Sequence, residues 1–155
     1  MRLFKRENVF KTLINTFQIA KRQFLALERR LASQPSLREQ YTQFIEEYIN
    51  LKHMREVKEP HSLPPNMHSY YMLHHPVMKE TSTTTKLRVV FNASCKSTTG
   101  VSLNDTLMVG PTVQQDLLSI FIRFRTHPVA LIADIEKMYR QVLVHEEDTP
   151  LQRII

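Results

Sequence analysis

The sequence predicts an α+β protein, with helices first and a small sheet after them. Apolar residues recur every three or four positions in residues 1–58, which is the period of a helix. In 70–93 they alternate with polar residues, which is the period of a strand. With 155 residues, 42% of them hydrophobic and 23% charged, the chain is one globular domain or a piece of a larger one.

A pair of helices is expected within residues 1–58. The apolar stripe of the first consists of Phe10, Leu13, Phe17, Ala20, Phe24, Leu27 and Leu31. The string "SQPS" ends this pattern, and Ser36 and Glu39 then have the spacing of a capping box for a second helix. The stripe of that helix consists of Leu37, Tyr41, Phe44, Ile45, Tyr48 and Ile49. Both stripes are typical of core or docking surfaces.

A linker and a β-hairpin should follow the helices. Residues 59–69 are polar and contain three prolines, which is typical of a linker. The strings "YYMLHHPVMK" (70–79) and "KLRVVFNA" (86–93) predict the two strands of a hairpin over 70–93. Alternation gives it one apolar and one cationic face, and both Lys79 and Arg88 could project from it. Two cations at that range suit a triphosphate, although a polar face turned to solvent explains them equally well.

The last part of the chain predicts one helix and two strands. Residues 112–125 form an amphipathic pattern, with Thr112 as the expected N-cap. An apolar strand is expected over 129–135, with Asp134 near its end. A second strand-like run covers 141–144. A buried carboxylate without a partner is costly, so Asp134 either caps a turn in water or meets a cation. Mg²⁺ suits the second alternative, because it takes oxygen ligands.

The distribution of charge indicates possible partners, and the cysteine content and apolar stretches indicate the compartment. Residues 1–60 hold 12 Lys and Arg against 7 Asp and Glu, whereas residues 61–155 hold 9 against 8. A basic N-terminal portion suggests a nucleic acid, or simply a solvated basic helix face. Cys95 is the only cysteine, and no apolar stretch is long enough for a membrane span or typical of a signal peptide. We expect a cytoplasmic or nuclear protein that is not secreted and not bound to a membrane.

Four strings together resemble a known family: "LRVVFNAS", "SLNDTLMVGP", "QQDLLSIFIRFR" and "ADIEKMYRQVLVH". In this order they are similar to the reverse transcriptase of BEL/Pao-type LTR retrotransposons, and the likeness runs from about Leu27 to the last residue. The resemblance implies that 70–93 is the fingers hairpin and that 129–135 is the first strand of the palm. Residues 70–155 would then be a partial reverse transcriptase domain, preceded by the helical region 1–58.

The resemblance also implies roles for individual residues. Asp134 matches the first metal-binding, catalytic aspartate, and Ile135 would add its backbone carbonyl to the Mg²⁺ or Mn²⁺ ion. Backbone N–H groups of Lys137 and Met138 would approach the incoming deoxynucleotide, whose sugar Tyr139 would gate. The family's fingers cations that hold the triphosphate correspond to Arg88 and Lys79.

The resemblance implies partners as well: an RNA or DNA template-primer, deoxynucleoside triphosphates, and the protease, RNase H and integrase of the same polyprotein. Such an enzyme works in the cytoplasm, within a virus-like particle, or in the nucleus.

One feature of the family is missing. Its Tyr-x-Asp-Asp hairpin supplies further metal-binding aspartates, and no such string follows Asp134. We therefore expect an N-terminal fragment with an incomplete palm, inactive by itself. Two alternatives stay open: a non-catalytic remnant that binds nucleic acid through the basic helices of 1–58, and a helical module that binds proteins through its Phe and Leu stripes.

Overall fold

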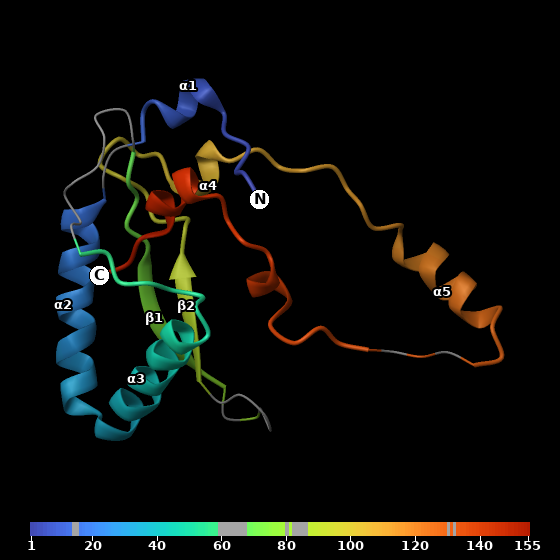
Figure 1. Ribbon diagram of the computed structural model, residues 1–155, viewed down its shortest axis with the longest axis horizontal. Helices are drawn as coiled ribbons and strands as arrows, with labels where there is room; N and C mark the ends of the chain where they lie inside the picture. Colours follow the sequence, from blue (N-terminus) through green and yellow to red (C-terminus); the bar gives the residue numbers. More distant parts are fainter. Residues whose placement is uncertain (14–15, 59–67, 80, 82–86, 130, 132) are drawn as a thin grey trace.

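The protein is an α+β chain in which helices pack against one face of a two-stranded antiparallel sheet (Figure 1). The computed structural model describes residues 1–13, 16–58, 68–79, 81, 87–129, 131 and 133–155. Its elements, in chain order, are α1 (Glu7–Phe10), α2 (Phe17–Ser33), α3 (Pro35–Asn50), β1 (Leu73–Met78), β2 (Leu87–Asn92), α4 (Leu103–Thr106), α5 (Leu117–Arg125) and the 3₁₀ helices η1 (Met138–Gln141) and η2 (Glu146–Gln152). The predicted linker over 59–69 lies almost wholly outside the described residues.

The helix pair exists, with two differences from the prediction. Phe10 belongs to the separate short helix α1, and α2 begins at Phe17. The second helix starts at Pro35 rather than behind a capping box at Ser36, and Gln34 is its N-cap without a side-chain hydrogen bond. Proline explains the earlier start, because its fixed φ suits the first helical position and it has no N–H group to satisfy.

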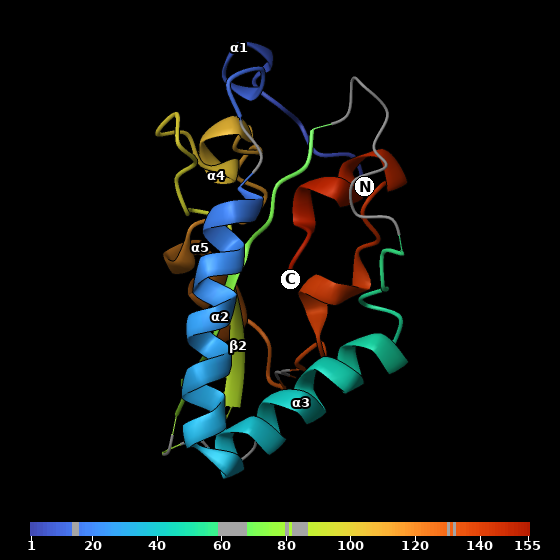
Figure 2. The ribbon, with the colours of Figure 1, turned by 90° about the vertical axis from the view of Figure 1, so that its left-hand side faces the viewer.

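The hairpin packs its apolar face against the helix pair. Leu73 pairs with Asn92 at one end of the register and Met78 with Leu87 at the other. Leu87 and Val89 are buried in one core cluster with residues of the two helices, namely Leu27, Leu31, Leu37 and Tyr41. Figure 2 shows α2 lying over the sheet on one side. The opposite face, here called the open face, carries the exposed residues His75, Val77, Arg88 and Val90.

A second core joins segments that are far apart in the sequence. Leu13, Tyr70, Leu103 and Leu151 are buried together. Residues 94–111 contain α4, which Ser102 and Asp105 start with a reciprocal capping box. The predicted strand over 141–144 is wrong, because Gln141 ends η1 and 142–144 connect it to η2 without forming a strand.

The first and last segments of the chain are tied by polar contacts. Asp148, which is buried, accepts a hydrogen bond from the backbone N–H of Leu3 at 2.8 Å and pairs with the ammonium of Lys5. The N–H of His145 donates to the Met1 carbonyl at 2.7 Å. These contacts place the N-terminal segment against η2.

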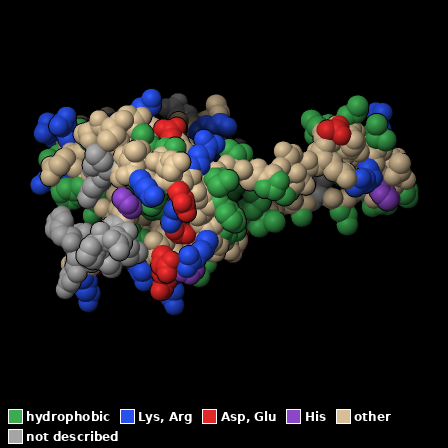
Figure 3. Space-filling view, turned by 90° about the horizontal axis from the view of Figure 1, so that it is seen from above, with side chains coloured by type: hydrophobic (Ala, Val, Ile, Leu, Met, Phe, Trp, Pro, Cys, Tyr) green, Lys and Arg blue, Asp and Glu red, His purple; other side chains and the backbone are tan. Residues whose placement is uncertain are grey.

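Residues 108–136, excluding 130 and 132, form an extended arm that carries α5 away from the body of the protein (Figures 1 and 3). The predicted helix over 112–125 starts five residues late, at Leu117, because Asp116 rather than Thr112 caps it. The Asp116 carboxylate accepts from the N–H of Ser119 at 3.0 Å. In this part of the chain, the sequence predicted the helix but not its start.

Candidate functional site

The open face of the hairpin carries the two cations that the sequence pointed to. Arg88 lies opposite Val77, and its side chain is exposed because its neighbours Leu87 and Val89 face the helices. Lys79 follows β1 directly and is exposed as well. Continued one residue beyond Met78, the alternation of side chains along β1 puts Lys79 on the side of Val77 and diagonal to Arg88.

Within the described residues, neither Arg88 nor Lys79 forms an ion pair. The ion pairs of that part of the chain involve Arg2, Lys5 and Lys137. An arginine can grip phosphate oxygens with two parallel hydrogen bonds, and a lysine adds a movable point charge. The pair can therefore hold a polyphosphate or a nucleic-acid backbone without first releasing a carboxylate of the described residues.

Asp134 lies in the arm, away from the hairpin. The predicted strand over 129–135 is wrong for the described residues of that range. Residues 129, 131 and 133–135 belong to no strand, while 130 and 132 lie outside the described part. A strand needs a neighbour to pair its backbone groups, and within the described residues β1 and β2 pair only with each other. Val129 and Leu131 are exposed, as is Asp134. The carboxylate thus stands in water.

The segment after Asp134 turns back to the body through η1. Lys137 has a φ of +53°, which is left-handed backbone, and its ammonium pairs with the carboxylate of Glu47 on α3. This hydrogen bond lowers the pKa of Glu47. Ile135 and Met138 are exposed, and Tyr139 is 87% exposed. The side chain of Lys137 is therefore engaged with α3, whereas the ring of Tyr139 is open to a ligand.

Arg140 and Tyr48 form a second contact between η1 and α3, which sequence reasoning missed. The guanidinium carbon of Arg140 lies 4.3 Å from the centre of the Tyr48 ring, a cation–π contact. Burial raises the pKa of Tyr48 despite the nearby guanidinium. Arg140 stands in the string "ADIEKMYRQVLVH", but nothing in its spacing pointed to an aromatic residue more than 90 positions earlier.

The described residues do not gather a metal site. No group of three His, Cys, Asp or Glu side chains comes together among them. The nearest carboxylate in sequence, Glu136, is exposed two residues from Asp134 and forms a long ion pair of 3.8 Å with Lys137. Two-metal chemistry needs several converging oxygen ligands, so Asp134 by itself does not fit a pair of Mg²⁺ or Mn²⁺ ions.

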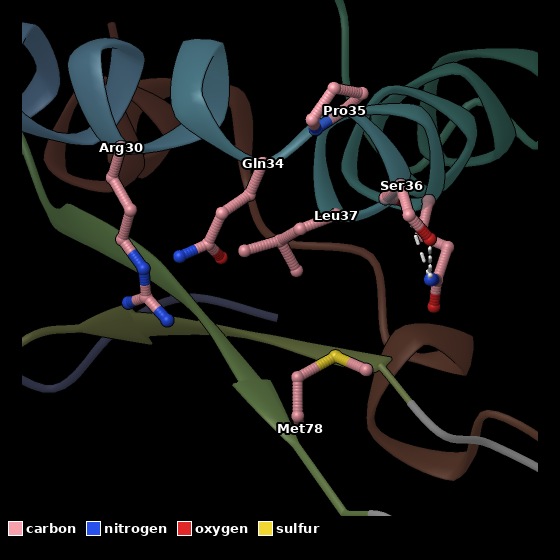
Figure 4. Close-up of a pocket in the computed structure, with 7 residues that line it drawn as sticks. Arg30, Gln34, Pro35, Ser36, Leu37 and Met78 are labelled. Atoms are coloured by element: carbon pink, nitrogen blue, oxygen red, sulfur yellow. Dashed lines mark hydrogen bonds between the residues drawn. The ribbon is translucent and has the colours of Figure 1, made fainter.

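A shallow cavity of about 330 Å³ lies at the corner between α2 and α3, away from the open face (Figure 4). Arg30, Gln34 and Leu37 line it together with Met78 at the end of β1. Gln40 and Ser36 also line the cavity, and the Gln40 side-chain amide donates a hydrogen bond to the Ser36 carbonyl at 3.3 Å. Neither Arg88 nor Asp134 lines this cavity, so it is separate from the predicted site residues.

Comparison with known proteins adds no relative: no family model, no curated protein and no solved structure matches the chain. Within the described residues, no helix combines the length and the apolar character needed to cross a membrane.

Proposed function

We propose that this chain is the fingers and the start of the palm of an RNA-directed DNA polymerase of the BEL/Pao type, and that it is inactive alone. The observation that carries the proposal is the open face of the hairpin, where Arg88 and Lys79 are exposed without an acidic partner within the described residues. This is the surface that a triphosphate or a template-primer needs. The four strings that resemble the family add the reaction class, and Asp134 is its catalytic residue.

In this proposal different residues bind the phosphates, the sugar and the metal ion. Arg88 and Lys79 grip the phosphates of a deoxynucleoside triphosphate, and the exposed ring of Tyr139 packs beneath its sugar. Mg²⁺ or Mn²⁺ would join only where further carboxylates accompany Asp134, such as those of a Tyr-x-Asp-Asp hairpin. The rest of the polyprotein, with protease, RNase H and integrase, would be the protein partner, in a cytoplasmic particle or the nucleus.

Binding measurements test the hairpin part of the proposal. A fluorescent deoxynucleoside triphosphate and a labelled RNA–DNA duplex are titrated with the chain, and anisotropy is followed. Arg88→Ala is expected to weaken binding about tenfold, as is Lys79→Ala, since each removes a charge-assisted contact. Arg38→Ala is the matched control, because Arg38 is an exposed cation on α3 away from the hairpin. Equal losses for all three variants would contradict the proposal.

The polymerase part has a separate test. The transcript is read beyond the codon for Ile155. A frame that continues into a Tyr-x-Asp-Asp string supports the enzyme, and the longer product should then incorporate nucleotides in a way that Asp134→Asn abolishes. A stop codon at that point would overturn the catalytic role of Asp134.

A second candidate is a non-catalytic protein that binds nucleic acid through α2. Lys21, Arg22 and Arg29 are exposed on this helix, and none of them forms an ion pair within the described residues. The triple variant Lys21→Ala, Arg22→Ala, Arg29→Ala should then weaken duplex binding and reduce its salt dependence, while Arg88→Ala leaves both unchanged. The opposite pattern favours the polymerase.

A further inference from the structure

Helix α5 is mostly apolar, and its large apolar side chains are not buried. Six of its nine residues are large and apolar, and none is buried: Leu117, Leu118, Ile120, Phe121, Ile122 and Phe124. Phe121, in the middle of the helix, is 56% exposed. Figure 3 shows hydrophobic side chains on the surface of the arm. The apolar side of an amphipathic helix is normally buried, and a large exposed apolar patch marks an interaction surface.

We propose that α5 pairs antiparallel with α5 of a second copy of this chain, forming a symmetric dimer. The charges at the helix ends favour this arrangement. Asp116 caps the N-terminus, and Arg123 and Arg125 lie in the last turn. An antiparallel pair brings Asp116 of each copy to Arg125 of the other, whereas a parallel pair would set like charges side by side.

The apolar positions also suit a two-fold pair. Leu117, Phe121 and Phe124 are spaced by four and three residues, which is the spacing of a seam between two helices. Phe121 is the midpoint of Leu117–Arg125, so in an antiparallel pair it lies on the two-fold axis and meets its own copy. This seam is the amphipathic stripe seen in the sequence.

The size of the surface supports a whole-arm contact. A stable dimer buries about 800 Å² per partner, more than a pair of nine-residue helices supplies alone. Val113 and Leu131, each 90% exposed, and Val129 extend the apolar surface on both sides of α5. Because the arm carries α5 away from the body (Figure 1), two arms can meet without a clash between the two bodies.

The open face of the hairpin in the same molecule is a less favourable surface for α5 to pack against. The open face offers the half-exposed side chains of Val77 and Val90 beside Arg88 and Lys79. Folding α5 onto it would bring Arg123 and Arg125 to a surface that is already cationic. The second copy avoids this repulsion, since it meets each basic end with an acidic one.

Sedimentation equilibrium of the full chain, from about 1 to about 100 µM, tests the dimer. The mass is expected to rise with concentration from 18.3 kDa to twice that value. Phe121→Glu places two carboxylates on the axis and should raise the dissociation constant about 100-fold. Val90→Glu is the matched control on the open face and should leave the dissociation constant unchanged. Far-UV circular dichroism checks that both variants stay folded.

A charge-exchange experiment tests the antiparallel arrangement. Asp116→Lys and Arg125→Glu should each weaken self-association about tenfold, because each sets like charges against one another. Mixed in equal amounts, the two variants should associate about as tightly as the unchanged chain. A monomer at every concentration would overturn the proposal, as would a Phe121→Glu variant that still dimerises or a mixture no tighter than its components.

Discussion

Helices α2 and α5 have similar amphipathic patterns in the sequence but opposite environments in the structure. In α2 the stripe is buried through Ala20, Leu27 and Leu31, because the hairpin and α3 lie against it. In α5 no side chain is buried. An apolar stripe therefore predicts that a helix forms, while the rest of the fold decides whether anything covers it. The body and the arm should differ accordingly in every measurement of stability.

The largest expected difference separates a buried leucine from an exposed phenylalanine. Leu27→Ala should lower the free energy of unfolding by about 3 kcal/mol, because it leaves a cavity between α2 and the hairpin. Phe121→Ala should lower it by less than about 0.5 kcal/mol, since its ring is mostly exposed. Urea unfolding at about 1 µM, where the proposed dimer is dissociated, measures both. Similar losses for the two variants would contradict the contrast between body and arm.

The next largest effect concerns the tie between the N-terminal segment and η2. Burial opposes ionisation of the Asp148 carboxyl, but hydrogen bonds from Lys5 and the Leu3 N–H outweigh it and hold the pKa below 3.8. Asp148→Asn should cost about 2 kcal/mol at pH 7, since it removes charge-assisted hydrogen bonds from a buried position.

The same carboxyl predicts a pH dependence. A lowered folded pKa stabilises the protein above the ordinary value of 3.8, and this stability is lost as the pH falls from there through the folded pKa. Thermal unfolding between pH 5 and pH 2, values chosen around that pKa, should show the loss for the unchanged chain. The amide introduced by Asp148→Asn cannot titrate, so an equal acid-induced loss in this variant would show that another group is responsible.

The longer elements of the fold could be predicted from the sequence, whereas the shortest helix and the presence of a partner strand could not. The helix pair and the hairpin follow from periodicities over long windows, and both are confirmed. Helix α4 has only four residues, too few for a periodic signal, although Ser102 and Asp105 mark its start. The described residues of 129–135 form no strand, because an apolar run does not show whether a neighbouring strand exists.

The candidate site could be predicted only in part, for a similar reason. Alternation along β2 was enough to put Arg88 on the polar face, and the structure has it there. The contacts of Lys137 with Glu47 and of Arg140 with Tyr48 join positions about 90 residues apart. Such contacts depend on the path of the whole arm, which no local pattern contains.

A smaller pH effect is expected from His74, which is partly buried beside Phe24, Tyr41 and Phe91. Its Nε2 donates to the Ile155 carbonyl at 3.0 Å, and its Nδ1 accepts from the Tyr41 hydroxyl. Burial lowers the pKa of His74 from 6.5, against the hydrogen bond to Ile155 that raises it. The unfolded chain therefore takes up the proton first, and stability falls as the pH drops from 6.5 through the folded pKa.

His74→Gln tests this effect, because glutamine cannot titrate. Between pH 8 and pH 5, values that bracket the ordinary pKa, the free energy of unfolding should fall more for the unchanged chain than for the variant. His127 is exposed in the arm and provides the control, since His127→Gln should leave the pH dependence as it is. Loss of the dependence in the control instead would place the titrating group in the arm.

The smallest effect should come from the contact at which the arm returns to the body. Arg140→Ala removes a cation–π contact with Tyr48 and should lower global stability by less than about 1 kcal/mol. Its local effect should be larger, because this contact and the Lys137–Glu47 pair tie η1 to α3. Amide hydrogen exchange is therefore expected to accelerate in 137–141 and to stay unchanged in β1 and β2. Arg123→Ala, on the exposed arm helix, is the control that should change neither, and acceleration that spread into the hairpin would mean that the arm and the body unfold together.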